Sequence, residues 1–365
     1  MKRLTLGDVC KKASSNIAQK DLQDKIGAYP IYGASGLIKQ VDFYQQDKEY
    51  IAVVKDGAGI GRTMLLPAYS SVIGTMQYLL PKEGIPIDIK YLFYAVEHMN
   101  LAKYFSGATI PHIYFKDYQK EPINIPDIDT QRKISRIFDK IDALITSRKE
   151  QRTKLDQIVK SRFIELFGDP VSNPHGYPKI PLSKLAEIKI GPFGSLLHKE
   201  DYIANGHALV NPSHIVAGKI SVDKELTVSD EKFRELSAYH LQVGDVVMGR
   251  RGEMGRCAVV QTGGLLCGTG SILIRTKGEV TADYLQKIIS FPSFKKGIED
   301  MAVGQTMPNL NVPIVSKFQI IQPPIEVQNA YYTFVEQTDK SKLAIQKSLD
   351  KLEILKKALM QKYFG

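Results

Sequence analysis

The chain has 365 residues, enough for two domains that each bury their own core. Apolar residues make up 43% of it, which excludes a disordered protein, and no uninterrupted apolar stretch reaches the roughly 18 residues of a membrane span. The formal charge of +10 favours a polyanionic partner, because positive charge lowers the free energy of contact with phosphates.

The first 129 residues are predicted to form short strands and turns. Residues 29–36 are predicted to be an aromatic loop punctuated by glycines. Residues 50–54 form an apolar strand, 56–61 a turn and 63–66 a second strand. The apolar spacing over 87–104 predicts a helix.

A long helix is predicted from residue 130 to 167, where neither proline nor glycine occurs. At 1.5 Å per residue it would extend for about 57 Å. A strand-and-turn segment follows, and then a second long helix over 327–364. Neither helix is apolar on all sides, so we expect the two to pack as an antiparallel coiled pair. Their apolar stripes comprise Ile134, Ile137, Ile141, Leu144, Leu155 and Ile158, and Tyr331, Phe334, Ile345, Leu352, Leu355 and Leu359.

Residues 107–168 and 304–365 match without a gap at an offset of 197. A repeat of this length indicates two copies of a whole module. The predicted class is α+β, with a globular segment over 1–129, a helix over 130–168, a second globular segment over 169–326 and a helix over 327–365. The globular segments match more loosely, for example Gly61-Arg62 with Gly255-Arg256 at an offset of 194.

No segment combines the residues of a catalytic, cofactor or metal site. The glycines of 57–61 resemble a dinucleotide-binding turn, but a strand is predicted where that motif needs a helix. Residues 322–325, Gln-Pro-Pro-Ile, resemble an adenine methyltransferase loop without its amide or acid and its aromatic residue. Asp169, Glu187 and Lys189 form a nuclease-like set only by spacing. The histidines lack metal-ligand spacing.

Two basic, glycine-rich turns occupy the same place in both copies. One contains Lys55 and Arg62, and the other contains Arg250, Arg251 and Arg256. Arginine suits phosphate and the two acceptors of guanine, and glycine lets the backbone come close. We therefore predict that both turns bind DNA, with solvated hairpins as the alternative.

Cysteine usage indicates a reducing compartment. Cys10, Cys257 and Cys267 are odd in number and lack metal-ligand spacing, which is typical of small, partly buried thiols. No secretory hydrophobic core follows Met1, so we expect a cytoplasmic protein.

Taken together, the chain resembles the specificity subunits of type I restriction–modification systems over essentially its whole length. The motifs that carry the resemblance are 29–36, 190–195, 107–111, 304–308 and the Ile-x-x-Pro-x-Ile-x-x-Gln ahead of each helix. The resemblance implies two target-recognition domains of mixed α/β fold, held in inverted orientation by two long antiparallel helices. It adds Ser195, in the motif that opens the second domain, to the expected DNA contacts.

The resemblance also implies a non-catalytic subunit that recognises a bipartite, asymmetric site on double-stranded DNA. Two methyltransferase subunits, and restriction subunits in the full complex, would be the partners of one copy of the chain. S-adenosylmethionine, ATP and Mg²⁺ would be bound by those partners. Because the helices are the better-matched part of the repeat, we expect partner contacts at Gln131, Asp142, Gln328 and Asp339.

Other interpretations stay open at this point. The system could be methylation-only, or of a related fused type. The chain could be a single-chain methyltransferase or nuclease, although no segment has room for a cofactor fold. A duplicated adaptor that binds no DNA is the third possibility.

Overall fold

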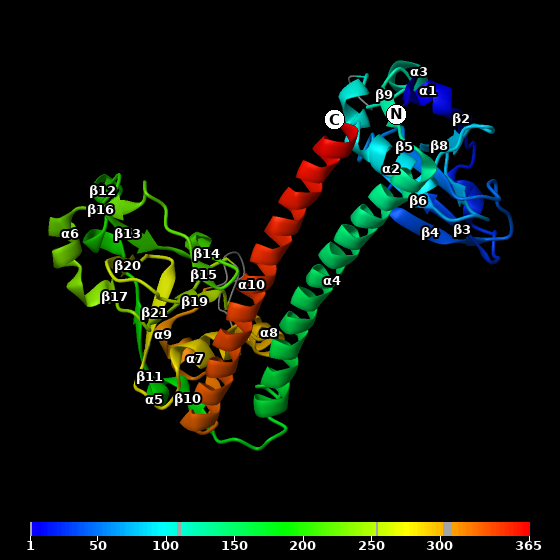
Figure 1. Cartoon of the computed structure of the whole chain (residues 1–365). Coiled ribbons are helices and arrows are strands. Elements are labelled where there is room, and N and C mark those ends of the chain that lie inside the picture. The colour runs from blue at the N-terminus through cyan, green and yellow to red at the C-terminus, as the bar shows by residue number, and fades with distance from the viewer. Residues whose placement is uncertain (1, 108–110, 253–254, 302–308) are drawn as a thin grey trace. The chain divides into compact units, whose positions relative to one another are not determined.

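The computed structural model describes residues 2–107, 111–252, 255–301 and 309–365. Its contacts divide the chain into two compact units, residues 1–152 with 344–365, and residues 153–343. Each unit holds one globular head and parts of two long helices, α4 (Ile128–Phe167) and α10 (Ile325–Phe364) (Figure 1). The α+β class is confirmed. The contacts group each head with the helix segments that pack onto it.

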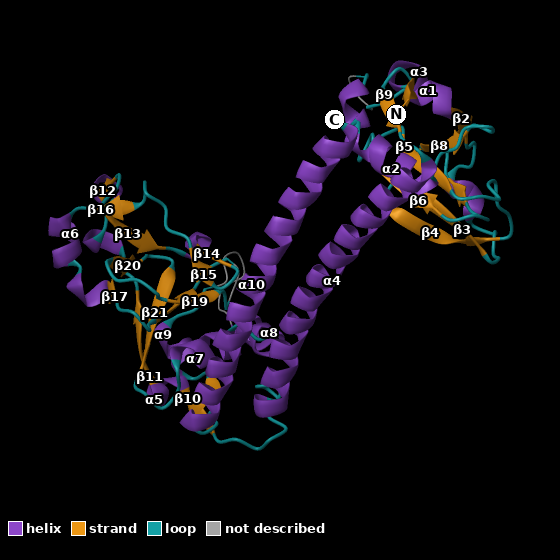
Figure 2. Ribbon diagram, in the orientation of Figure 1, coloured by secondary structure: helices purple, strands orange, loops and turns teal. Residues whose placement is uncertain are grey.

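A four-stranded antiparallel sheet forms the centre of the first head (Figure 2). In spatial order its strands are β2 (Cys10–Ser14), β8 (Met76–Pro81), β5 (Tyr50–Val54) and β6 (Thr63–Leu66). Every residue of β5 is buried, since Ile51 and Val53 face helix α2 (Ile89–His98) and Tyr50 packs on the other side. Burial on both faces explains why this strand is a continuous apolar run.

The second head repeats this sheet, in the same order and with the same antiparallel pairing. Its strands are β11 (Ala186–Ile190), β21 (Ser271–Thr276), β18 (Val246–Gly249) and β19 (Cys257–Val259). Helix α7 (Ala282–Ile289) takes the place of α2. The Tyr91 hydroxyl donates to the Asn124 carbonyl, and that of Tyr284 donates to the Ile321 carbonyl, so both helices have the same anchor.

Each head closes on a two-stranded antiparallel ribbon just ahead of its long helix. The ribbons pair β1 (Lys2–Thr5) with β9 (Pro122–Ile125), and β10 (Lys179–Pro181) with β22 (Gln319–Ile321). Short helices flank them: α1 (Leu6–Val9), α3 (Phe115–Tyr118), α5 (Leu182–Leu185) and α9 (Val312–Ser316).

The outer parts of the heads differ. The first head has a three-stranded sheet, in which β3 (Tyr29–Gly33) lies between β4 (Gly36–Val41) and β7 (Ser71–Val72). Residues 29–36, expected to be a loop, are therefore mainly a strand that continues into the turn of a hairpin, because Ile31 and Gly33 are buried on one side. The helix expected over 87–104 is shorter, and a 3₁₀ turn, η2 (Leu101–Tyr104), completes it.

A larger outer part belongs to the second head (Figure 1). Its five-stranded sheet contains β12 (Tyr202–Ile203), β16 (Thr227–Val228), β13 (His207–Val210), β20 (Leu265–Cys267) and β17 (His240–Leu241). A hairpin of β14 (Ile215–Val216) and β15 (Lys219–Ile220), with helices α6 (Asp230–Glu235) and α8 (Pro292–Met301), completes this head.

The long helices run antiparallel within each unit. In the first unit, Lys356 Nζ lies 2.9 Å from Asp142 Oδ1, and Arg152 Nη1 donates to Gln346 Oε1 over 2.7 Å. In the second, Lys342 Nζ lies 2.7 Å from Asp156 Oδ1. Residue numbers thus rise along α4 as they fall along α10, which confirms the predicted antiparallel pair.

The apolar stripes of the helices only partly face the interior. Ile134 and Ile141 are buried, but Leu144, Ile158 and Leu355 are close to half exposed. The two helices therefore pack through only part of each predicted stripe. The helix ends are buried more fully, and Phe167 packs against Tyr284 and Tyr331 in the second unit.

The three cysteines are free, and they are buried more fully than the partial burial that the sequence predicted. Burial raises the pKa of Cys10 and of Cys257 to about 12, so both are neutral thiols near pH 7. Among the described residues, no helix has the length and apolar character needed to cross a membrane.

Candidate nucleic-acid interface

The first basic turn connects β5 to β6. Gly57, Gly59 and Gly61 all adopt positive φ. A Cβ atom at Gly61 would lie 2.3 Å from the backbone nitrogen of Ala102, so this position requires glycine. The turn leads directly into strand β6 and not into a helix, which removes the dinucleotide-binding alternative.

The second basic turn connects β18 to β19 in the same way. Backbone hydrogen bonds fix its equivalence to the first: Lys55 N donates to Thr75 O, and Arg250 N donates to Gly270 O, each over 3.0 Å. The closing bonds also correspond, from Val54 N to Arg62 O and from Gly249 N to Arg256 O.

These bonds make Lys55 equivalent to Arg250 and Arg62 equivalent to Arg256. The second turn is one residue shorter. The offset of 194 that aligns Arg62 with Arg256 at the end of each turn therefore does not hold at its beginning. There, Asp56 is the equivalent of Arg251.

The five predicted cationic side chains of these turns differ in exposure and in the hydrogen bonds that they form within the chain. In the first turn, Arg62 is exposed and donates from Nη1 to Ala34 O over 2.9 Å, whereas the Lys55 side chain is 22% exposed. In the second turn, Arg250 Nε donates to Asn309 Oδ1 over 3.0 Å. Burial and neighbouring Arg251 lower the pKa of Arg250.

Arg251 and Arg256 differ most clearly in exposure. Arg251 is exposed, whereas Arg256 is partly buried and donates from Nη1 to Pro212 O over 3.3 Å. Arg256 also lines a cleft of about 600 Å³ between the β14–β15 hairpin and helices α7 and α8. No group of three or more metal-binding side chains comes together within the described ranges.

A second loop packs on each turn. The backbone nitrogen of Ile113 donates to Lys55 O over 3.0 Å, and that of Leu310 donates to Arg250 O over 2.9 Å. His112 Nδ1 is hydrogen-bonded to the Asp56 carboxylate. Sequence reasoning missed His112 and Asn309, although both lie at the same point after the repeated Gly-x-Thr-x-Pro motif. Most of that motif, at 108–110 and 302–308, lies outside the described residues.

Tyr114 adds an aromatic surface to the first of these loops. Its side chain is 47% exposed, and its ring centre lies 4.1 Å from that of His112. The Lys116 ammonium lies 5.2 Å from the centre of the same ring. Aromatic and cationic side chains side by side suit a nucleic-acid surface.

The loop that follows the edge strand leaves each sheet at the same end as the basic turn. In the second head, Ile190 ends β11 and Met248 is near the end of β18, and both pair with Ile272. In the first head, Ser14 of β2 and Val53 of β5 likewise share Gln77. Ser195 lies in this loop, in η3 (Gly194–Leu196). Three loops of each head therefore emerge at one end of its sheet, which we call the turn end.

The predicted partner contacts at Gln131 and Gln328 are corrected by the structure. Both side chains are fully buried. Gln131 Oε1 accepts from Asp88 N and its amide donates to the carbonyls of Pro86 and Pro126.

Gln328 repeats these bonds with Thr281 N and the carbonyls of Glu279 and Pro323. The two glutamines join the start of a long helix to the start of α2 or α7. Because every polar atom of each side chain is used inside the chain, neither can contact a partner subunit.

Asp142 and Asp339 occupy different settings. Asp142 accepts from the Tyr94 hydroxyl and forms an ion pair with Lys356, so it holds the two helices together in the first unit. Asp339 is 63% exposed and pairs with Lys342, one turn away on its own helix. Asp142 is thus engaged within the chain although its side chain is 37% exposed, and Asp339 is the more exposed of the two predicted partner contacts.

Similarity to known proteins agrees with this geometry. A family model described as the type I restriction modification DNA specificity domain matches residues 1–157 and 176–355. The type I restriction enzyme MjaVIII specificity subunit of Methanocaldococcus jannaschii is 20% identical over 328 residues, 85% of this chain and 77% of the relative. The EcoprrI specificity subunit of Escherichia coli is 28% identical over 152 residues, 40% of this chain and 37% of the relative.

Solved structures share the fold. The S subunit of a type I restriction–modification system from M. genitalium aligns with a TM-score of 0.60 at 15% identity, over 100% of this chain and 96% of that one. A chain from a structure of type I R-M complex assembly aligns with a TM-score of 0.63 at 14% identity, over 100% of this chain and 97% of that one. Since the family model covers most of both halves of the sequence, the chain belongs to the specificity subunits of type I restriction–modification systems.

Proposed function

We propose that the chain selects a bipartite, asymmetric site on double-stranded DNA, with one head at each half-site. The observation that carries this proposal is the equivalence of two cationic turns, in which Lys55 corresponds to Arg250 and Arg62 to Arg256. The shared sheets provide one frame twice, which suits a ligand with two half-sites. The loops at the turn ends differ between the heads, so the half-sites differ in sequence.

Binding of two methyltransferase subunits is the second part of the proposal, with restriction subunits added in the full complex. Two equal partners need the same surface twice. The long helices present such a surface at positions that are 197 residues apart in the sequence. There the Ile158 side chain is 48% exposed, and its counterpart Leu355 is 47% exposed. An exposed lysine lies one turn earlier on the same face of each helix, Lys154 in one copy and Lys351 in the other. This matched strip, and not the buried glutamines, is the docking surface we propose.

The catalytic chemistry is proposed to reside in the partners. S-adenosylmethionine would be bound by the methyltransferase subunits, and ATP with Mg²⁺ by the restriction subunits. The chain would act in the cytoplasm as a single copy within the hetero-oligomer. Its own contribution is then to position the partners on a chosen sequence.

Genome-wide mapping of methylated adenines tests the proposal. The chain is co-expressed with its methyltransferase subunit in a host that lacks other adenine methylation. We expect one motif with two unlike half-sites and a fixed gap, and no motif when the chain is omitted. Methylation that is independent of the chain, or that follows one continuous half-site, would overturn the proposal.

A further inference from the structure

The two basic turns carry opposite charges at one equivalent backbone position. Backbone hydrogen bonds place Lys55 and Arg250 at the same point, so the next residues, Asp56 and Arg251, also correspond. Each of these two forms the isolated bridge that ties the turn to the second loop, Asp56 with His112 and Arg251 with Asn309. The position before is cationic in both heads, as Lys55 and Arg250, and the position after is glycine in both, as Gly57 and Gly252.

The shared frame does not require a carboxylate here. In the second head the same two loops are joined through Arg250 and Asn309, whose side chains are 3.0 Å apart, and the turn closes with an arginine in place of Asp56. The identity of residue 56 is therefore a property of the first head alone. Its side chain remains 28% exposed at the turn end.

His112 leaves part of the Asp56 carboxylate free to accept another hydrogen bond. Oδ1 is hydrogen-bonded to His112 Nδ1, which fixes the carboxylate. Oδ2 lies 3.8 Å from Lys55 Nζ, beyond hydrogen-bonding distance. An acceptor with a fixed orientation is thus present beside the Lys55 ammonium, with which it forms a long ion pair.

The chemistry of DNA limits what such an acceptor can bind. A carboxylate is repelled by phosphates, so it gains energy on DNA only at a base edge that offers a donor. In the major groove that donor is the exocyclic amine of cytosine or adenine, whereas guanine offers two acceptors that suit arginine.

We propose that Asp56 reads the exocyclic amine of a cytosine or adenine in the first half-site, and that Arg251 reads a guanine at the corresponding place in the second. This inference rests on the proposed function. It adds which residue separates the two specificities and which base chemistry each one selects.

Methylation mapping of variants in complex with the methyltransferase subunit tests this assignment. The main variant is Asp56→Arg with His112→Asn, which installs the residue types of the second head in the first. We expect one position of the first half-site to change from cytosine or adenine to guanine, with the second half-site unchanged. Arg251→Asp should produce the reverse change in the second half-site only.

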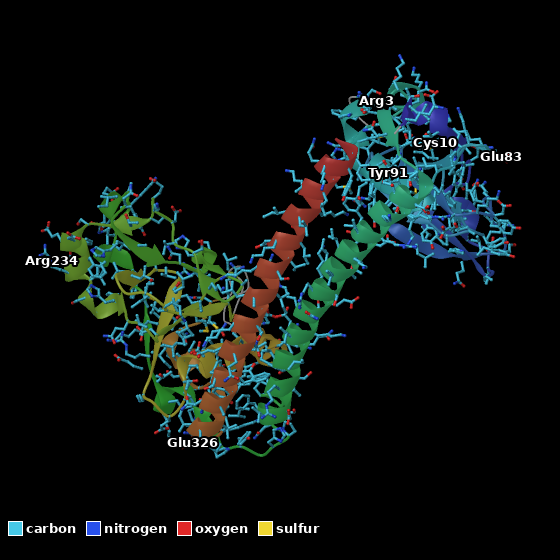
Figure 3. All side chains as sticks on the ribbon, in the orientation of Figure 1. Arg3, Cys10, Glu83, Tyr91, Arg234 and Glu326 are labelled. Carbon is cyan, nitrogen blue, oxygen red and sulfur yellow. The ribbon has the colours of Figure 1, made fainter. Side chains whose placement is uncertain are left out.

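Asp56→Asn, which keeps the shape of the side chain, covers the case in which the double variant fails to fold. It should relax the preference at the same position by about ten-fold. Glu83→Gln is the matched control, since Glu83 is exposed and follows the end of β8 opposite the basic turn (Figure 3). This control should leave both half-sites unchanged.

The outcomes separate this inference from the proposed function. If the wild-type chain directs methylation to a bipartite site but the site is the same for Asp56→Asn and for the double variant, only the assignment of Asp56 is wrong. If the wild-type chain directs no site-specific methylation, the proposed function itself fails. A change in the second half-site after substitution of Asp56 also overturns the assignment.

Discussion

Arg251 and Arg256 lie in one turn but differ in exposure and in their hydrogen bonds within the chain. Arg251 is exposed, whereas Arg256 is partly buried and bonds to the Pro212 carbonyl. Arg251→Ala should therefore cost about 1–3 kcal/mol of discrimination and relax the sequence requirement in the second half-site only. Arg234→Ala removes the same charge from exposed helix α6 and should change neither half-site (Figure 3). Equal affinities of wild type and Arg251→Ala for target and mismatched duplexes would contradict this role.

Gln131 and Gln328 give a prediction about stability. Replacing either by alanine leaves one buried backbone N–H and two carbonyls without their partner, and an unsatisfied buried group costs about 1–3 kcal/mol. We expect each variant to lower the free energy of unfolding by that amount, measured by urea titration. Gln151→Ala, at an exposed position of α4, is the control and should have little effect. A glutamine variant as stable as this control would show that the junction does not depend on the side chain.

At the residue scale the sequence located the two basic turns between strands but not the register that relates them. Composition was enough to single out Lys55, Arg62 and the three arginines. The equivalence of Asp56 with Arg251 was not visible, because it depends on one residue of turn length that only backbone hydrogen bonds reveal. Burial of Gln131 was also hidden, since a repeated polar residue is equally compatible with an internal clamp and with a partner contact.

Among the elements, the long helices were the most predictable. A run without proline or glycine, preceded by a proline and followed by Gly168, defines α4 to within two residues at its start. Which apolar positions are buried was less predictable. Their spacing is the same whether a residue faces a partner helix or solvent, so the exposure of Ile158 and Leu355 had to come from the packing.

That exposure gives a prediction about assembly. Ile158→Glu places a charge on one of the two matched docking positions, and Leu355→Glu does so on the other. Each variant should bind one methyltransferase subunit in place of two, as counted by native mass spectrometry, and the double variant should bind none. Leu343→Glu, at an exposed position whose counterpart is Thr146, is the control for an added charge on α10. Two subunits bound to the double variant would place the docking surface elsewhere.

We also propose that the two long helices fix the gap between the half-sites. Four residues inserted after Gln151 add about 6 Å and rotate the remainder of the helix by about 40°, so recognition should be lost or its gap changed. Seven residues, inserted there and after Lys347 on α10, keep the helical phase within about 20° and add about 10 Å. Because about three added base pairs also rotate one half-site by roughly 100° about the DNA axis, this second variant should not methylate the original site. Full activity at the original gap in both variants would show that the helices do not fix the distance between the half-sites.

On the scale of the whole molecule, the repeat predicted two copies of one module and the α+β class. It could not predict that the compact units cut across both helices. This division arises from tertiary packing, because the end of each helix buries aromatic residues on a head, as Phe167 does against Tyr284. The outer part of each head was also beyond reach, since the short strands of the five-stranded sheet carry little periodic signal.

The net charge of the whole molecule should determine how strongly its affinity for DNA depends on salt. With a formal charge of +10, the chain in complex with its methyltransferase should lose affinity linearly on a log–log plot against salt. Lys55→Ala and Arg62→Ala should each reduce the slope by about one, equally on target and scrambled duplexes, because a phosphate contact carries no sequence information.

Arg3→Ala, on exposed strand β1, removes one charge away from the turn and is the control for net charge alone. If all three variants shift the slope equally, long-range charge and not contact at the turn is responsible. If only the two turn variants shift it, the turn lies on the DNA backbone. Together with a base-specific effect at residue 56, that result would divide one short turn into cations that hold the duplex and a single position that reads it.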